Sequence, residues 1–157
     1  SFPYENLYLS LYHNSPKFIF LEIYRMIEKL YPIIFYYNFR KGFGLNNITT
    51  LEMQDKMQGK LKIRHREKDA IFHIFEYCKE NKKIEEYLNK LNQYKTEIDI
   101  DNKTTELDKW IYKIRNTSVH LSFDKKKDVD ILSILEKDII VANLIPIVVE
   151  LYISILN

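Results

Sequence analysis

The chain has 157 residues, of which 46% are hydrophobic and 29% are charged, and this balance excludes a disordered polymer. Its formal net charge of +2 does not by itself indicate nucleic-acid binding, because affinity for a polyanion depends on where the cations lie. Only three glycines and four prolines separate long apolar blocks, which disfavours a β-sandwich or barrel. We therefore expect one all-α domain over residues 1–157, and because it does not begin with Met we also consider it as a fragment of a longer protein.

The first strong helix-start pattern is "NSPKF", in which Ser15 can cap a helix and Pro16 takes the first helical position. Apolar residues at three- and four-residue spacing then predict a long helix through about Phe39. Pro32 is expected to kink this helix or split it in two. The opposite, polar side of the helix comprises Glu22, Arg25 and Lys29.

The middle of the chain predicts a loop and two further helices. Two glycines and an Asn-Asn pair indicate a loop from Asn38 to about Thr50, followed by a short helical stretch around "LEMQDKMQ". The segment "REKDAIFHIFEYC" predicts a helix that ends near Asn81, and "KKIEEYLNKLNQY" predicts the next one. A polar connection is expected from Lys95 to Lys103. The inward positions of the first of these helices are Ile71, Ile74, Phe75 and Cys78.

Two helices are predicted in the last third of the chain. Thr104 or Thr105 can cap the first, and its inward positions are Leu107, Trp110, Ile111 and Ile114. The second runs from about Val129 almost to the end, and its stretch 139–156 is apolar nearly all round. Polar and proline residues interrupt that stretch, so we expect a buried central or dimer-interface helix and no membrane span. The expected fold is an up-and-down bundle of four to five helices with a long C-terminal helix.

The segment "KIRNTSVHLSF" carries the residues that can act on a phosphate. On a helix Asn116 and His120 face the same way, and Arg115 flanks the apolar stripe on a long stem, so the three polar ends can converge. A guanidinium suits phosphate oxygens, and an imidazole can take or give a proton near neutral pH. Metal-free RNA cleavage needs a base, an acid and a cation. Two copies of the motif across a two-fold dimer would supply all three.

The same residues also have a purely structural interpretation. A helix-terminal arginine and a nearby histidine are commonly solvated residues that interact favourably with the helix dipole. The spacing of Arg115 and His120 alone does not decide between the structural and the catalytic interpretation.

The hexapeptide Arg115 to His120 resembles the R-x4-6-H motif, in its RN-x3-H form, of the HEPN superfamily of RNA-processing and defence proteins. The phrase "SPKFIFLEIYRMIEKLY" is similar to the early helix of HEPN proteins linked to phage defence. The resemblance implies a metal-independent endoribonuclease that acts as a homodimer, with Arg115 and His120 catalytic and Asn116 assisting. It also implies products with a 2′,3′-cyclic phosphate, a toxin or anti-phage effector role, and an antitoxin or regulatory domain as partner. The alternative is an inactive HEPN-like module for dimerisation or for binding a partner or nucleotide.

Further residues are candidates for supporting roles. Glu28 lies at the border of an apolar helix face and can reach a partner such as Arg115 or His120, although a routine boundary glutamate is the alternative. Two basic groups can contact RNA or can simply be solvated. They comprise Lys125, Lys126 and Lys127 after the motif, and Lys62, Arg64 and Arg66 within "KLKIRHREK".

Metal and cofactor sites are not expected. The histidines have no metal-ligand spacing, and no glycine-rich phosphate loop or catalytic cysteine setting is present in the sequence. The lone cysteine, Cys78, excludes an intramolecular disulfide, and its apolar helical setting is typical of a core residue in a reducing cytoplasm.

Overall fold

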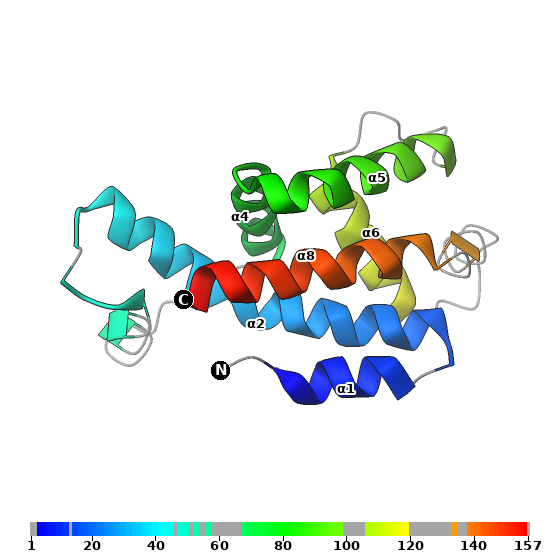
Figure 1. Cartoon of the computed structure of the whole chain (residues 1–157), viewed down its shortest axis with the longest axis horizontal. Coiled ribbons are helices and arrows are strands. Elements are labelled where there is room, and N and C mark those ends of the chain that lie inside the picture. Colours follow the sequence, from blue (N-terminus) through cyan, green and yellow to red (C-terminus); the bar gives the residue numbers. More distant parts are fainter. Residues whose placement is uncertain are drawn as a thin grey trace.

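The computed structural model describes residues 3–12, 14–45, 47–50, 52–53, 56–57, 67–98, 106–119, 133–134 and 138–156. Its principal elements are all helices, namely α1 (Tyr4–Tyr12), α2 (Pro16–Gly42), α4 (Glu67–Lys79), α5 (Lys82–Ile98), α6 (Leu107–Val119) and α8 (Ile139–Leu156). Figure 1 shows α1, α2, α8 and α5 side by side in that order, with α4 and α6 running across them. The prediction of an all-α bundle is confirmed.

The long helix predicted after "NSPKF" is present as α2. Ser15 occupies the N-cap position with an extended backbone, although its side chain makes no capping hydrogen bond, and Pro16 begins the helix. Pro32 lies inside the helix, and the later turns (cyan in Figure 1) run at an angle to the earlier ones, so α2 is bent but not split. Because α2 continues to Gly42, the loop predicted from Asn38 begins later than expected. Gly44 then takes a left-handed conformation (φ 63°) in the turn that follows.

The segment before Ser15 forms a helix, α1, that the sequence pattern did not predict. It packs along the polar side of α2, so Glu22 is buried with only 6% of its surface exposed. Asn6 Nδ2 donates a hydrogen bond to Glu22 Oε2 over 2.7 Å, and Oδ1 of the same side chain accepts one from Lys29 Nζ. Arg25 pairs with the other oxygen of Glu22. Glu22 thus lies on the polar side of α2 and is nevertheless buried, because α1 supplies a polar group that bonds to it.

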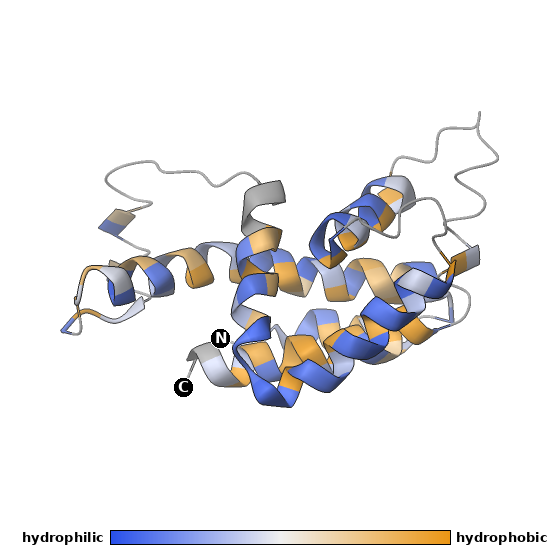
Figure 2. Cartoon of the chain, turned by 90° about the horizontal axis from the view of Figure 1, so that it is seen from above, coloured by the Kyte–Doolittle hydropathy of each residue, from blue (hydrophilic) through white to orange (hydrophobic). Residues whose placement is uncertain are grey.

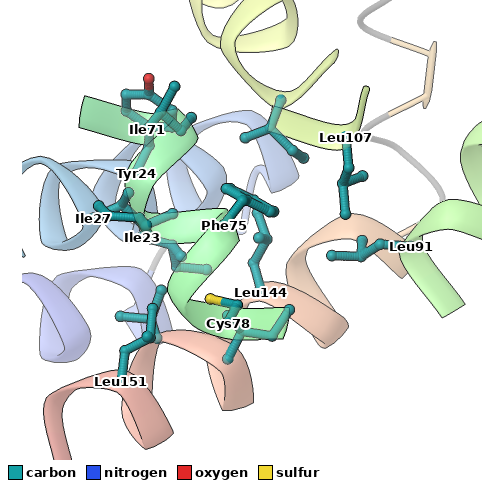
Figure 3. Packing of buried hydrophobic residues seen from close by; sticks show 14 of the residues in the cluster. Ile23, Tyr24, Ile27, Ile71, Phe75, Cys78, Leu91, Leu107, Leu144 and Leu151 are labelled. Atoms are coloured by element: carbon teal, nitrogen blue, oxygen red, sulfur yellow. The ribbon is translucent and has the colours of Figure 1, made fainter. Parts of the chain in front are cut away.

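The hydrophobic core lies where α2, α4, α5, α6 and α8 meet. Figure 3 shows side chains from these helices converging, including Ile23, Phe75 and Leu144. In Figure 2, orange and blue bands alternate along the helices, as amphipathic helices that bury one face require. Tyr152 of α8 donates its hydroxyl to the carbonyl of Met26 in α2 over 2.8 Å, which ties the last helix to the first long one.

The break predicted near Asn81 is confirmed. The side-chain oxygen of Asn81 accepts a hydrogen bond from the Lys83 N–H over 3.0 Å and so caps the start of α5. Because α5 continues to Ile98, the polar connection predicted from Lys95 begins too early, and Lys95 itself is buried. The four inward positions predicted on α4 are all buried, namely Ile71, Ile74, Phe75 and Cys78.

The last helix begins at Ile139 and not near Val129. Asp138 has φ 55°, a left-handed conformation that interrupts α-helical geometry, so one continuous helix from Val129 is wrong. The Asp138 carbonyl accepts the Ala142 N–H over 2.8 Å and opens α8. One side of α8 is buried in the core, including Ile140, Leu144 and Leu151, whereas Ile139 and Ile153 are exposed. Among the helices that the structure describes, none is both long and apolar enough to span a membrane.

Candidate functional site

The last turns of α6 carry the described part of the "RNTSVH" motif. The apolar stripe predicted on this helix is confirmed by the burial of Leu107, Trp110, Ile111 and Ile114. Trp110 is 2% exposed and meets Tyr94 edge-on, with ring centroids 6.5 Å apart. Since Arg115 and Asn116 directly follow the last residue of this stripe, their side chains emerge at the edge of the core, where both are half-buried.

Arg115 is held by side chains of α2. Its Nη2 atom lies 3.1 Å from Oε1 of Glu28, in an ion pair that is also a hydrogen bond. The guanidinium carbon lies 5.7 Å from the centre of the Tyr24 ring, which is cation–π distance. Tyr24 and Glu28 are four residues apart, so one face of α2 presents both groups. Glu28 thus contacts one of the two partners proposed for it from the sequence, and its role in function stays a prediction.

Asn116 constrains the other side of the same guanidinium. Nη1 of Arg115 donates to Oδ1 of Asn116 over 3.0 Å, while Nη2 donates to Glu28. Two contacts on different nitrogens fix the plane of the guanidinium as well as its position. The carboxylate beside it balances its charge, so an incoming phosphate would compete with Glu28 or add to the pair.

Two tyrosines of α2 belong to this site and were not singled out from the sequence. Tyr31 donates its hydroxyl to the hydroxyl of Tyr24 over 3.0 Å, and both rings are buried. Tyr24, Glu28 and Tyr31 follow an i, i+4, i+7 pattern, which could have marked them as one face. Tyr24 is a core residue whose ring also supports Arg115.

The site is open to solvent in part. The side chain of Arg115 is 22% exposed and that of Glu28 is 32% exposed, so both can be reached from outside. Ser118, also in the motif, is buried, and its Oγ has no hydrogen-bond partner among the described residues. A buried hydroxyl of this kind carries a free-energy cost.

Several predicted site residues lie outside the described residues. His120 directly follows Val119, the last residue of α6, whose side chain is 49% exposed. The two basic groups proposed to contact RNA are also outside the described part of the chain, namely Lys125, Lys126 and Lys127 and, earlier, Lys62, Arg64 and Arg66. Their proposed roles stay predictions.

A separate hollow of about 370 Å³ opens between α4, α5 and the start of α6. Its apolar lining includes Phe75 and Leu88, and its polar lining is mainly acidic. The charged residues of the lining are Glu76, Glu85, Glu106, Asp108 and Lys79. This excess of carboxylates disfavours a phosphate, so the hollow does not compete with Arg115 as a candidate RNA site.

Within the described ranges, no three His, Cys, Asp or Glu side chains lie close enough together to hold a metal ion. Comparison of the chain with protein-family models, with curated proteins and with solved structures gives no match.

Proposed function

We propose that the chain is a metal-independent endoribonuclease of the HEPN type, which acts as a homodimer and serves as a toxin or anti-phage effector. The proposal comes from the RN-x3-H resemblance of residues 115–120. The observation that supports it most is the fixed guanidinium of Arg115 at the end of α6, held by Glu28 and Asn116 and partly open to solvent. A fixed and accessible guanidinium is what transition-state stabilisation at a phosphate requires.

In this mechanism Arg115 binds the scissile phosphate and stabilises the charge that develops on the phosphorane. The ribose 2′-hydroxyl attacks phosphorus, its proton passes to one His120, and the bond to the 5′-oxygen breaks. The second His120 of the dimer protonates that oxygen, which gives a 2′,3′-cyclic phosphate and a 5′-hydroxyl. Asn116 and Glu28 are positioning residues that orient the guanidinium.

The experiment is incubation of the protein with RNA in EDTA, with analysis of the product ends. We expect wild type to cleave, and His120→Ala and Arg115→Ala each to lose at least about 100-fold in rate. The control is Lys113→Ala, which removes an exposed cation from the same helix and should cleave like wild type. Absence of cleavage by wild type, or equal cleavage by wild type and His120→Ala, would refute the catalytic proposal.

The alternative function is a non-catalytic helical module that dimerises or binds a partner or nucleotide. The Glu28–Arg115 ion pair favours it, since a carboxylate 3.1 Å from the guanidinium already neutralises the charge that a phosphate would need. The two functions differ for Glu28→Gln. If the site is catalytic, Glu28→Gln should lower kcat because the arginine loses its orientation. If the ion pair is only structural, Glu28→Gln should lower the free energy of unfolding and affect no catalytic rate.

A further inference from the structure

The hollow between α4, α5 and the start of α6 combines apolar surface with carboxylates. Its volume of about 370 Å³ lies in the range of roughly 300–1,000 Å³ that is usual for small-molecule sites. Figure 3 shows two of its apolar residues, Phe75 of α4 and Leu107 of α6, where these helices meet. Phe72, also in the lining, is 40% exposed, so a ligand can reach an aromatic ring. The hollow thus offers apolar contact and negative charge together.

The four carboxylates of the lining differ in whether a lysine already neutralises them. Glu76 and Glu106 each pair with a lysine three residues later in the chain. Glu85 and Asp108 form no ion pair and no hydrogen bond with any residue that the structure describes. Two negative charges of the hollow are therefore left to attract a ligand.

Asp108 is the more unusual of these two groups, because only 6% of its surface is exposed. A carboxylate that is taken out of water without a partner costs free energy, so buried charges are normally paired. Asp108 lies in the first turn of α6, where the helix dipole favours a negative charge. The dipole also acts on an exposed carboxylate such as that of Glu106, so it explains the charge of Asp108 but not its burial.

Lys79 shows how the hollow acts on a cation. This residue belongs to the lining, and its pKa is raised, chiefly by the hydrogen bond to Glu76 and further by the charges of Glu76, Glu106 and Asp108. The negative charge of Asp108 thus reaches an ammonium group in the wall of the hollow. A second cation placed beside Asp108 would be held by the same charge at a shorter distance.

We propose that this hollow binds an organic cation, namely an ammonium or guanidinium group joined to an apolar body. Asp108 and Glu85 supply the anionic contacts, and the Phe72 ring adds an apolar contact with cation–π attraction. No three carboxylates in the described part of the chain converge closely enough to hold a metal ion, so their spacing suits a larger cation. The cation can belong to a free amine or to a lysine or arginine side chain of another protein.

This site is separate from the proposed ribonuclease site. Asp108 and Arg115 are seven residues apart on α6, which is about 10 Å along the helix axis. Amine binding is measured without RNA, and RNA cleavage is measured without an amine. Failure of either proposal therefore leaves the other one intact.

The first experiment is an NMR titration of the isotope-labelled protein with phenethylamine, in which the amide resonances of the lining residues are followed. We expect them to shift with a dissociation constant of about 1 mM or below, a modest affinity for a ligand of this size. Phenethyl alcohol and hydrocinnamate keep the ring but remove or reverse the charge, and they should bind at least about tenfold more weakly. Binding of phenethyl alcohol as tight as that of the amine would overturn the proposal.

A second ligand distinguishes the two sources of the cation. Acetyl-Phe-Arg-amide carries the same ring beside a guanidinium on a peptide. Tighter binding of phenethylamine would support a free amine as the ligand, and tighter binding of the peptide would support a side chain of a partner protein. If neither cation shifts the resonances of the lining residues, the hollow is not a cation site.

Charge-removing variants test the named carboxylates. Asp108→Asn and Glu85→Gln keep the size of each side chain, and each should weaken phenethylamine binding at least about fivefold. The matched control is Glu86→Gln, which removes a carboxylate that is 71% exposed, adjacent to Glu85 and outside the lining, and should bind like wild type. Circular dichroism establishes that each variant is folded, and the exposed Glu85 remains informative if Asp108→Asn is not. Wild-type affinity in the folded variants of Asp108 and Glu85 contradicts the site.

Discussion

The contact between Glu28 and Arg115 can be tested as a free energy of interaction by a double-mutant cycle. The variants are Glu28→Gln, Arg115→Gln and the pair together, and the quantity measured is the free energy of unfolding in urea. The single tryptophan, Trp110, is buried and reports on unfolding by its fluorescence. Arg115→Gln removes the contact with the Tyr24 ring whether or not Glu28 is present, so that contact cancels in the cycle. The coupling free energy therefore reports the contact between Glu28 and Arg115 alone.

The burial of the pair determines the expected magnitude. The N···O distance is 3.1 Å and the side chains are 22% and 32% exposed, so the pair lies between a surface pair and a buried one. Exposed pairs contribute up to about 1 kcal/mol, and hydrogen bonds to charged groups contribute about 1.5–3 kcal/mol. We expect a coupling free energy of about 1–1.5 kcal/mol. It should fall by about half in 1 M salt, where the Debye length is about 3 Å.

The control pair is Glu86 and Lys90 on α5, which are in contact but exposed to 71% and 53%. Their coupling should be smaller than that of Glu28 and Arg115 and should vanish in high salt. A coupling for Glu28 and Arg115 within about 0.3 kcal/mol of zero would show that the Glu28 carboxylate does not hold the motif arginine in solution. Glu28 would then lose its role as a positioning residue.

Three further outcomes follow from packing and burial. Asn6→Leu should destabilise the protein by about 1–3 kcal/mol in urea, because Oε2 of the buried Glu22 loses the donor that Asn6 supplies, and an increase in stability would contradict the α1 contact. Ile114→Ala should cost about 2–5 kcal/mol at its fully buried site, and a loss below about 1 kcal/mol would place Ile114 outside the core. Burial raises the pKa of the Cys78 thiol from 9.0 to about 12, so the unfolded chain loses this proton first as pH rises. Stability should therefore fall between pH 9 and 12, and from pH 8 to 10 wild type should lose about 1.4 kcal/mol more than Cys78→Ala.

The helices that carry ordinary amphipathic patterns were predictable. In α2 and α6 the apolar positions repeat at three and four residues, and their burial follows from that spacing. The start of α2 was marked by Ser15 and Pro16, and the break after α4 by Asn81. The end of α2 was less predictable, because local propensity does not show that the helix continues past Asn38 to Gly42.

The features missed were those that depend on a partner helix. Helix α1 was not predicted, since its apolar residues face outward and its buried residues are Asn6 and Ser10. For the same reason the sequence placed Glu22 on the polar side of its helix but did not predict that α1 covers it. The contact of Arg115 with the ring of Tyr24 joins two helices, and no local pattern contains it. The sequence spacing could show only that Glu28 lies on a helix face from which it can reach a partner such as Arg115.

The separation of Glu28 and Arg115 by 87 positions has a consequence for synthesis of the protein. During synthesis, α2 leaves the ribosome with Glu28 and the tyrosines of the site before Arg115 has been added to the chain. The guanidinium can take its fixed orientation only when α6 has been made and has packed on α2, and α8 must follow to complete the core. A nascent or truncated chain that ends before α6 therefore has the carboxylate and the tyrosines of this site but no guanidinium for them to hold.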